Sequence, residues 1–232
     1  MPPANGSPDA DGYLVGPAAG TLLSPAEVDR IVQQSIAVAN RTRAVIRLPL
    51  GSRARMVIAV GDVDGTLLAI YRMPDATVFS IDVAAAKARN VVYFSSPPGA
   101  NDVGEVQPLA AITNRTISFG AQNLFPAGID GSGPGPFFDL YQNDFAHPCS
   151  QGFAPPNANQ NGIVFFPGSI PLYRGNTLVG GLGISGDGVE QDDYVSFHGA
   201  QGFLPPKNLW ADNRFVSGVR LPFLKFPRNP ER

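Results

Sequence analysis

The chain has 232 residues, of which 44% are hydrophobic, so it can bury the core of one large domain without disulfides or metals. Its 17 Lys and Arg residues nearly balance 19 Asp and Glu residues, and no run of like charge forms a stripe, which argues against a nucleic-acid partner. No apolar stretch approaches the roughly 20 residues of a membrane span, which argues against a membrane protein.

Two features bear on the cellular compartment. The amino-terminal residues lack the basic and apolar regions of a signal peptide. Cys149 is the only cysteine and cannot form an internal disulfide. We therefore expect a cytoplasmic protein, with export left open if a signal has been removed.

The amino-terminal part predicts an arm followed by a helix. Residues 1–20 are rich in Pro, Gly, Ala and Asp, which favours a flexible arm. Ser24 can cap a helix, Pro25 suits its first position and Glu27 completes a capping box. Apolar residues then recur at helical spacing, at Val28, Ile31, Val32, Ile36 and Ala39.

A hairpin and a second helix are predicted next. Runs of strand-forming residues at 56–60 and 66–72 flank Asp64-Gly65, which favours a tight turn because glycine readily adopts a positive φ. A helix is predicted over residues 80–94, where small apolar residues on one side would allow close packing on a sheet.

The segment 116–162 interleaves Pro, Gly and Asn with many aromatic residues. Since a long loop inside a domain is usually functional, we predict an insertion that folds over the domain or into a subunit interface. The predicted domain spans residues 21–204 and contains this insertion, and an extension over 205–232 packs on a surface.

Strands are predicted at 163–166, 170–173 and 177–184. The last contains three glycines, which would let another backbone or a ligand approach closely. A third helix is predicted to open at Asp187, with Asp187 and Glu190 supplying negative charge to its amino end.

Three stretches together resemble the GlcG/HbpS family, the haem-degrading domain that also forms the carboxyl end of PduO proteins. They are similar to the family's hairpin with its Arg-Met-Asp sequence, to its helix with a Lys-Ala pair, and to its Gly-Gly-Val-Pro and Gly-Val-Ser-Gly segments with a following Gln-Asp. Ser169 stands where the family pattern has its second glycine, and the insertion has no counterpart in the short members. The stretches are, in chain order, Ala59–Ala76, Asp82–Arg89, and Gly168–Pro171 with Gly180–Gly186 and Glu190–Asp192.

The resemblance implies an α/β (α+β) domain of two layers, in which helices flank an antiparallel sheet of about five strands, as in profilin. It also implies a homo-oligomer. In some members it implies binding of haem, a corrinoid or another small ligand, and in others an association with glycolate, diol or aromatic catabolism.

Three functions are therefore carried forward. The first is a binding protein that holds haem or a related small ligand between the sheet, the glycine-rich strand and the insertion. The alternative is an enzyme of small-molecule catabolism, acting on a glycolate, diol or aromatic acid. A third is a structural partner in a larger complex, with the insertion serving oligomer contacts.

Two cations are candidate contacts for an acidic ligand. Arg72 closes a strand beside the hairpin, and Lys87 interrupts an otherwise small and apolar helix. For both, we rank a structural ion pair with Asp62, Asp75 or Asp82 ahead of ligand binding.

Further candidates come from the turns and the histidines. Ser185 and Gly186 precede a helix and could bind a carboxylate through backbone N–H groups, although a tight turn explains them equally well. Gly168 is another candidate ligand contact. Haem iron needs an axial donor, and His147 in the insertion is the better candidate. His198 is more simply interpreted as a half-buried helical histidine bonded to a neighbour.

Overall fold

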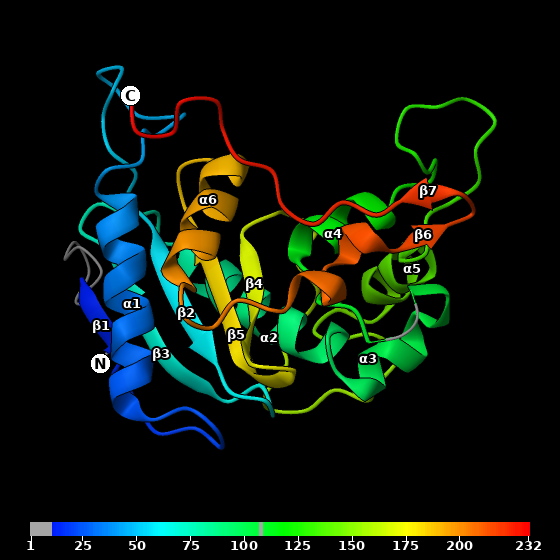
Figure 1. Ribbon diagram of the computed structural model, residues 1–232, viewed down its shortest axis with the longest axis horizontal. Coiled ribbons are helices and arrows are strands. Elements are labelled where there is room, and N and C mark those ends of the chain that lie inside the picture. The colour runs from blue at the N-terminus through cyan, green and yellow to red at the C-terminus, as the bar shows by residue number, and fades with distance from the viewer. Residues whose placement is uncertain (1–10, 107–108) are drawn as a thin grey trace.

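The protein is described by a computed structural model that covers residues 11–106 and 109–232. An antiparallel sheet with strand order β1-β3-β2-β5-β4 occupies one half of the structure, on the left in Figure 1. The strands are β1 Gly12–Val15, β2 Val57–Gly61, β3 Leu67–Arg72, β4 Ser169–Arg174 and β5 Thr177–Ser185. The helices are α1 Pro25–Ala39, α2 Ser80–Phe94, α3 Pro97–Asp102, α4 Asn114–Gly120, α5 Phe138–Ala146 and α6 Val189–Gly199.

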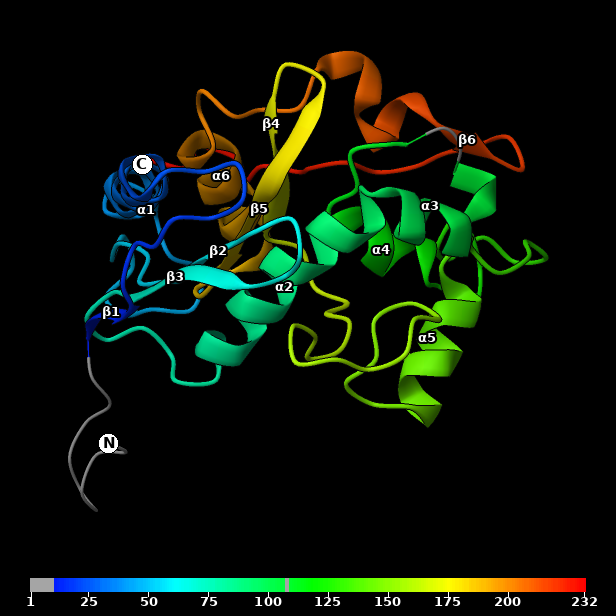
Figure 2. The same cartoon turned by 90° about the horizontal axis from the view of Figure 1, so that it is seen from below.

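Helices cover both faces of the sheet. Helix α2 lies on one face, and α1 with α6 lies on the other (Figure 2). The predicted fold class, a five-stranded antiparallel sheet flanked by helices, is confirmed. The helices on opposite faces give three layers rather than two. No helix in the described ranges is long and apolar enough to cross a bilayer.

Local sequence signals placed the first elements correctly. The capping box of Ser24 and Glu27 is formed at the start of α1. The β2–β3 hairpin turns at Gly65, whose φ is +85°, and α2 has the predicted bounds. Strand β1, however, lies within the segment predicted to be a flexible arm and pairs with β3. Residues 1–10 lie outside the described range, so the division into arm, domain and extension stays a prediction.

The glycine-rich strand β5 is covered by α2 and is not open to a ligand. A Cβ atom built on Gly183 would lie 2.1 Å from the carbonyl oxygen of Ala84, and one on Gly181 would lie 2.3 Å from that of Ala88. The backbone of the helix therefore occupies the space that side chains would need. The sequence allowed either a ligand or another backbone to lie against this strand. The expectation of a ligand is wrong, because the backbone of α2 occupies that space.

The insertion folds against α2 of its own chain through Asn90. This side chain is fully buried, and its Nδ2 donates to Gln151 Oε1 and to the Gly162 carbonyl, both at 2.9 Å. Its Oδ1 accepts from Val164 N at 2.8 Å. Residues 163–166 were predicted to be a strand, but they are not one in the structure. The backbone of Val164 is instead hydrogen-bonded by the side chains of Asn90 and Asn114.

The carboxyl-terminal extension lies across α4. It contains the short helices η2 Lys207–Leu209 and η3 Ala211–Asn213 and the ribbon of β6 Phe215–Val216 and β7 Val219–Arg220; a third short helix, η1 Gly104–Val106, follows α3. Thr116 Oγ1 in α4 donates to the Pro222 carbonyl at 2.7 Å. Trp210 stacks on Phe223 with ring centroids 4.8 Å apart. The predicted packing of the tail on a surface is therefore observed.

The close approach of α2 to β5 gives a direct test of the packing. Gly183→Ala should lower the free energy of unfolding by about 1–3 kcal/mol, since the added methyl group meets backbone that must move. Gly61→Ala is the matched control, because its Cβ would lie 3.6 Å from Ala88, an ordinary contact. Urea denaturation of both variants measures the difference, and equal stability of the two would contradict this packing.

Candidate functional site

Lys87 and Gly168 come together in a buried cluster between α2, β5 and α6. Lys87 is 1% exposed, and its Nζ donates to the Ile184 carbonyl at 2.7 Å and to Asp192 Oδ2 at 3.1 Å. A Cβ on Gly168 would lie 2.8 Å from that Nζ. Gly168 therefore closes over the ammonium group, and Lys87 is not available to a ligand.

A second buried ion pair lies beside the first. Arg115 in α4 pairs with Asp193, and the same carboxylate accepts from Gly168 N at 2.9 Å and from Lys225 N at 3.0 Å. One side chain of α6 thus connects α4, the residue before β4 and the carboxyl-terminal extension. Both carboxylates have a cation beside them, as buried charges require.

Burial raises the pKa of Asp192 and of Asp193 to about 6. Removal from water is the main cause, and it outweighs the opposing effects of Lys87 on Asp192 and of Arg115 on Asp193. Both carboxylates therefore take up a proton more readily than an ordinary aspartate does.

The other predicted ligand contacts also have partners within the protein. Ser185 Oγ donates to Ser80 Oγ at 3.0 Å, and the Gly186 backbone lowers the pKa of Asp192 through a hydrogen bond. The turn before α6 therefore binds an anion, but that anion is the protein's own carboxylate. Asp187 does not cap α6, because its carboxylate accepts from Arg47 and from Arg55 N.

Arg72 is the last residue of β3, away from this cluster. Its Nη1 donates to Asp11 at 2.8 Å, and its Nη2 donates to the Ala76 carbonyl at 2.6 Å. The structural interpretation of Arg72 and Lys87 holds, but Asp62, Asp75 and Asp82 are wrong as partners. Those three bind Thr21, Arg47 and Asn161, respectively.

The two histidines lie far apart in the fold. His147 follows α5 in an exposed loop, and it lines none of the clefts found among the described residues. His198 lies near the end of α6, half-buried among Tyr194, Phe197 and Phe226, with ring centroids 4.3, 5.3 and 6.0 Å from its own.

The His198 imidazole is kept neutral by its surroundings. Burial lowers its pKa, the Arg41 cation lowers it further, and Glu231 opposes both. Within the part of the chain that the structure describes, neither ring nitrogen has a hydrogen-bond partner. The predicted bond from His198 to a neighbour is therefore not formed, and the ring instead contacts the aromatic side chains around it. No group of three or more His, Cys, Asp or Glu residues in the described ranges could hold a metal ion.

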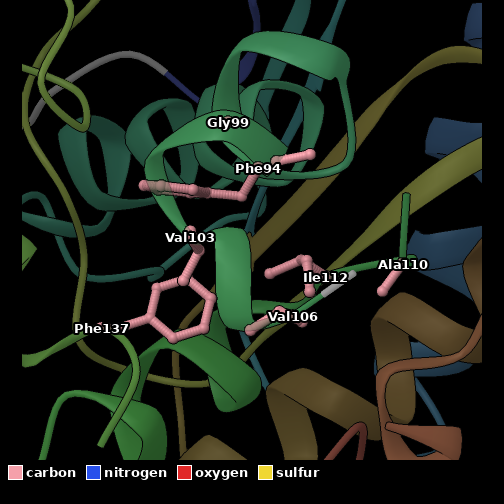
Figure 3. Close-up of a pocket in the computed structure, with 8 residues that line it drawn as sticks. Phe94, Gly99, Val103, Val106, Ala110, Ile112 and Phe137 are labelled. Carbon is pink, nitrogen blue, oxygen red and sulfur yellow. The ribbon is translucent and has the colours of Figure 1, made fainter. Parts of the chain in front are cut away.

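Four open clefts have volumes of about 250 to 350 Å³. One more cavity, of about 10 Å³, is walled by apolar side chains that include Phe94, Val103, Ile112 and Phe137 (Figure 3). A space of that size holds at most one water molecule, and its apolar side chains offer such a water no hydrogen bond. We regard it as a packing void.

The buried carboxylates predict how stability depends on pH. Their folded pKa of about 6 exceeds the ordinary value of 3.8, so between these values the folded chain holds protons that the unfolded chain has released. The stabilisation that these bound protons give the folded chain is present at pH 4 and is lost as the pH rises through 6. Between about pH 5 and 7, the free energy of unfolding of Asp192→Asn should therefore fall by roughly 1–2 kcal/mol less than that of the wild type.

Urea denaturation at several pH values measures this slope. Asp130→Asn is the control, because Asp130 is exposed and makes no ion pair within the described ranges. A slope unchanged in Asp192→Asn would show that the cluster does not titrate as described.

The chain matches known proteins over most of its length. The family model described as haem degrading protein HbpS-like matches residues 33–201. Corrinoid adenosyltransferase PduO of Salmonella typhimurium is 27% identical over 152 residues, and that of Citrobacter freundii is 28% identical over 151 residues. Each match covers 65% of this chain and 33% of the relative. The chain thus spans about a third of the length of the curated relatives it matches.

Solved structures match as well. A crystal structure of a PduOC–haem complex has a TM-score of 0.51 at 22% identity and covers 79% of this chain and 96% of its own. A double mutant of Streptomyces reticuli HbpS has a TM-score of 0.48 at 16% identity and covers 86% of this chain and 98% of its own. The first shows a shared fold, and the family model covers most of the chain. The chain therefore belongs to the HbpS-like family.

Proposed function

We propose that this protein binds haem or a related small ligand, with His198 as the axial donor to iron. Membership of the HbpS-like family indicates the ligand class, and one solved protein of the same fold is described as a haem complex. The observation that carries the assignment to a residue is the half-buried His198 ring without a hydrogen-bond partner in the described structure.

The donor fits the iron of haem chemically. A neutral imidazole is the form that ligates metal, and burial together with Arg41 favours that form of His198. Tyr194, Phe197 and Phe226 surround the ring with apolar surface on which a porphyrin could pack. His147 has no such surroundings and is the weaker candidate, which reverses the ranking from the sequence.

Cations lie close enough to serve the acidic groups of such a ligand. The Arg41 side chain is 48% exposed, and its Nε pairs with Glu231 at 2.6 Å. Arg53 Nη1 donates to the backbone carbonyls of Arg41 and Glu231, so a second guanidinium group binds the same segment of backbone. A propionate can compete for Arg41 because its present pair is exposed to solvent.

The size of the clefts limits how haem could be held. Pockets that enclose a ligand usually have about 300–1,000 Å³, and the clefts described above, at about 250 to 350 Å³, lie at or below the small end of that range. We therefore propose that the ligand lies on an open face at α6. When bound, haem would supply a redox-active iron, and the protein's contribution is to ligate, shield and orient it.

We also propose a homo-oligomer located in the cytoplasm. Phe145 and Phe153 of the insertion and Phe166 just after it are 81%, 55% and 62% exposed, and contacts with another copy would bury them. The free, exposed Cys149 suits a reducing compartment. The catabolic-enzyme alternative has lost its two carboxylate-orienting residues, since Arg72 and Lys87 both bind protein groups, and we do not propose it.

Titration with haemin tests this function. The wild-type protein should give a saturable shift of the Soret band. His198→Ala should weaken haemin binding at least roughly tenfold, because the iron loses its axial donor.

His147→Ala is the matched control and should titrate like the wild type. Loss of the Soret shift in His147→Ala but not in His198→Ala would reverse the assignment. A folded wild-type protein that gives no saturable shift would exclude haem.

A further inference from the structure

A cleft on the opposite side of the sheet from His198 has features of a separate ligand site. It has a volume of about 270 Å³ and lies between the β2–β3 turn, α2 and the insertion. Its lining includes one arginine, Arg89, together with amide side chains of the insertion at Gln151, Asn157, Asn159 and Gln160. Val63, Val92 and Tyr93 also line it, so the cleft combines apolar walls with a few polar groups, as small-ligand pockets commonly do.

Arg89 is a half-buried cation that binds only neutral groups. Its Nε donates to the Gly65 carbonyl and its Nη1 to Asn161 Oδ1, both at 2.9 Å. Asn161 also bridges to an acidic residue, because its Nδ2 donates to Asp82 Oδ1 at 2.9 Å. No carboxylate forms an ion pair with Arg89 among the described residues; burial lowers its pKa, and the charge of the nearby Asp82 partly opposes this. Its Nη2 keeps hydrogen-bonding capacity for an acidic ligand.

Gln160 supplies a second, independent sign of a missing partner. Its Oε1 atom is buried, and no donor reaches it within the described ranges. A buried acceptor without a donor is unfavourable, and a ligand hydroxyl would satisfy it once this half-buried side chain turns toward the cleft that it lines.

The remaining walls limit the ligand further. Tyr93 donates its hydroxyl to Asp102 at 2.6 Å, and burial raises its pKa, so its ring offers a neutral aromatic wall. Asp64 also lines the cleft, and its carboxylate accepts from Thr66 N at 2.8 Å. A second carboxylate on the ligand would meet repulsion there, whereas a hydroxyl could donate to it.

We infer that this cleft binds a small sugar acid, with one carboxylate and several hydroxyl groups. The carboxylate pairs with Arg89, and a hydroxyl donates to Gln160 Oε1. The amide groups of the insertion bind further hydroxyls. This site differs from the proposed haem face in its residues, its charge and its position in the fold.

Calorimetric titration of the full chain with D-gluconate tests the inference. The wild-type protein should give saturable heat at millimolar concentration, and glucose and hexanoate, which lack the carboxylate or the hydroxyls, should bind at least roughly tenfold more weakly. Arg89→Gln should lose roughly tenfold in affinity for gluconate.

Two further variants make the result independent of folding. Gln160→Leu removes an acceptor that has no donor, so the variant should fold normally yet bind gluconate several-fold more weakly. Arg220→Gln, at an exposed arginine outside the cleft, should bind as the wild type does. Absence of saturable heat with gluconate and glucuronate, or equal affinity in the wild type, Arg89→Gln and Gln160→Leu, would overturn the inference. Neither outcome affects the Soret titration, which reports on the haem face separately.

Discussion

The close approach of α2 to the sheet is the constraint on which the rest of the structure depends. Gly181 and Gly183 present bare backbone to Ala84 and Ala88, and the helix lies so near that any side chain on these glycines would collide with it. This proximity lets Lys87 reach the Ile184 carbonyl and Asp192. It also fixes Asn90 and Arg89 on the outer side of the helix, where the insertion binds them.

Two buried polar side chains on α2 therefore connect the helix to different parts of the chain. Lys87 joins the helix to β5 and α6, and Asn90 joins it to the insertion. Ser169, the departure from the family pattern, adds a third connection, because its hydroxyl donates to Asn114 Oδ1 at 2.7 Å. The polar residues in these stretches mostly bind other parts of the protein, and for that reason we propose ligand binding on the outer faces of the helices.

Elements defined by short-range signals could be predicted from the sequence. The cap at Ser24, the turn at Gly65 and the bounds of α2 depend on residues within a few positions of each other. The partner of Lys87 could not be predicted, because Asp192 lies 105 residues away and many acidic residues were equally acceptable by chemistry. The missing strand at 163–166 has the same cause, since distant asparagine side chains bind its backbone.

The candidate site was predicted less well than the fold. The sequence contained His198, but its aromatic surroundings come from α6 and from Phe226 in the extension, which meet only in the folded chain. Arg89 stood beside Lys87 in a family-like stretch, and only burial without a carboxylate partner distinguishes it. The two outer faces of the fold, one at α6 and one along α2, thus carry different chemistry on one scaffold.

The most direct test of this division is chemical-shift mapping with gallium protoporphyrin IX, a diamagnetic analogue of haem. We expect the perturbed amide resonances to cluster at Tyr194, Phe197, His198 and Phe226, with little change around Arg89 and Gln160. Perturbations centred on the α2–insertion cleft, or on His147, would contradict the assignment of the haem face to α6.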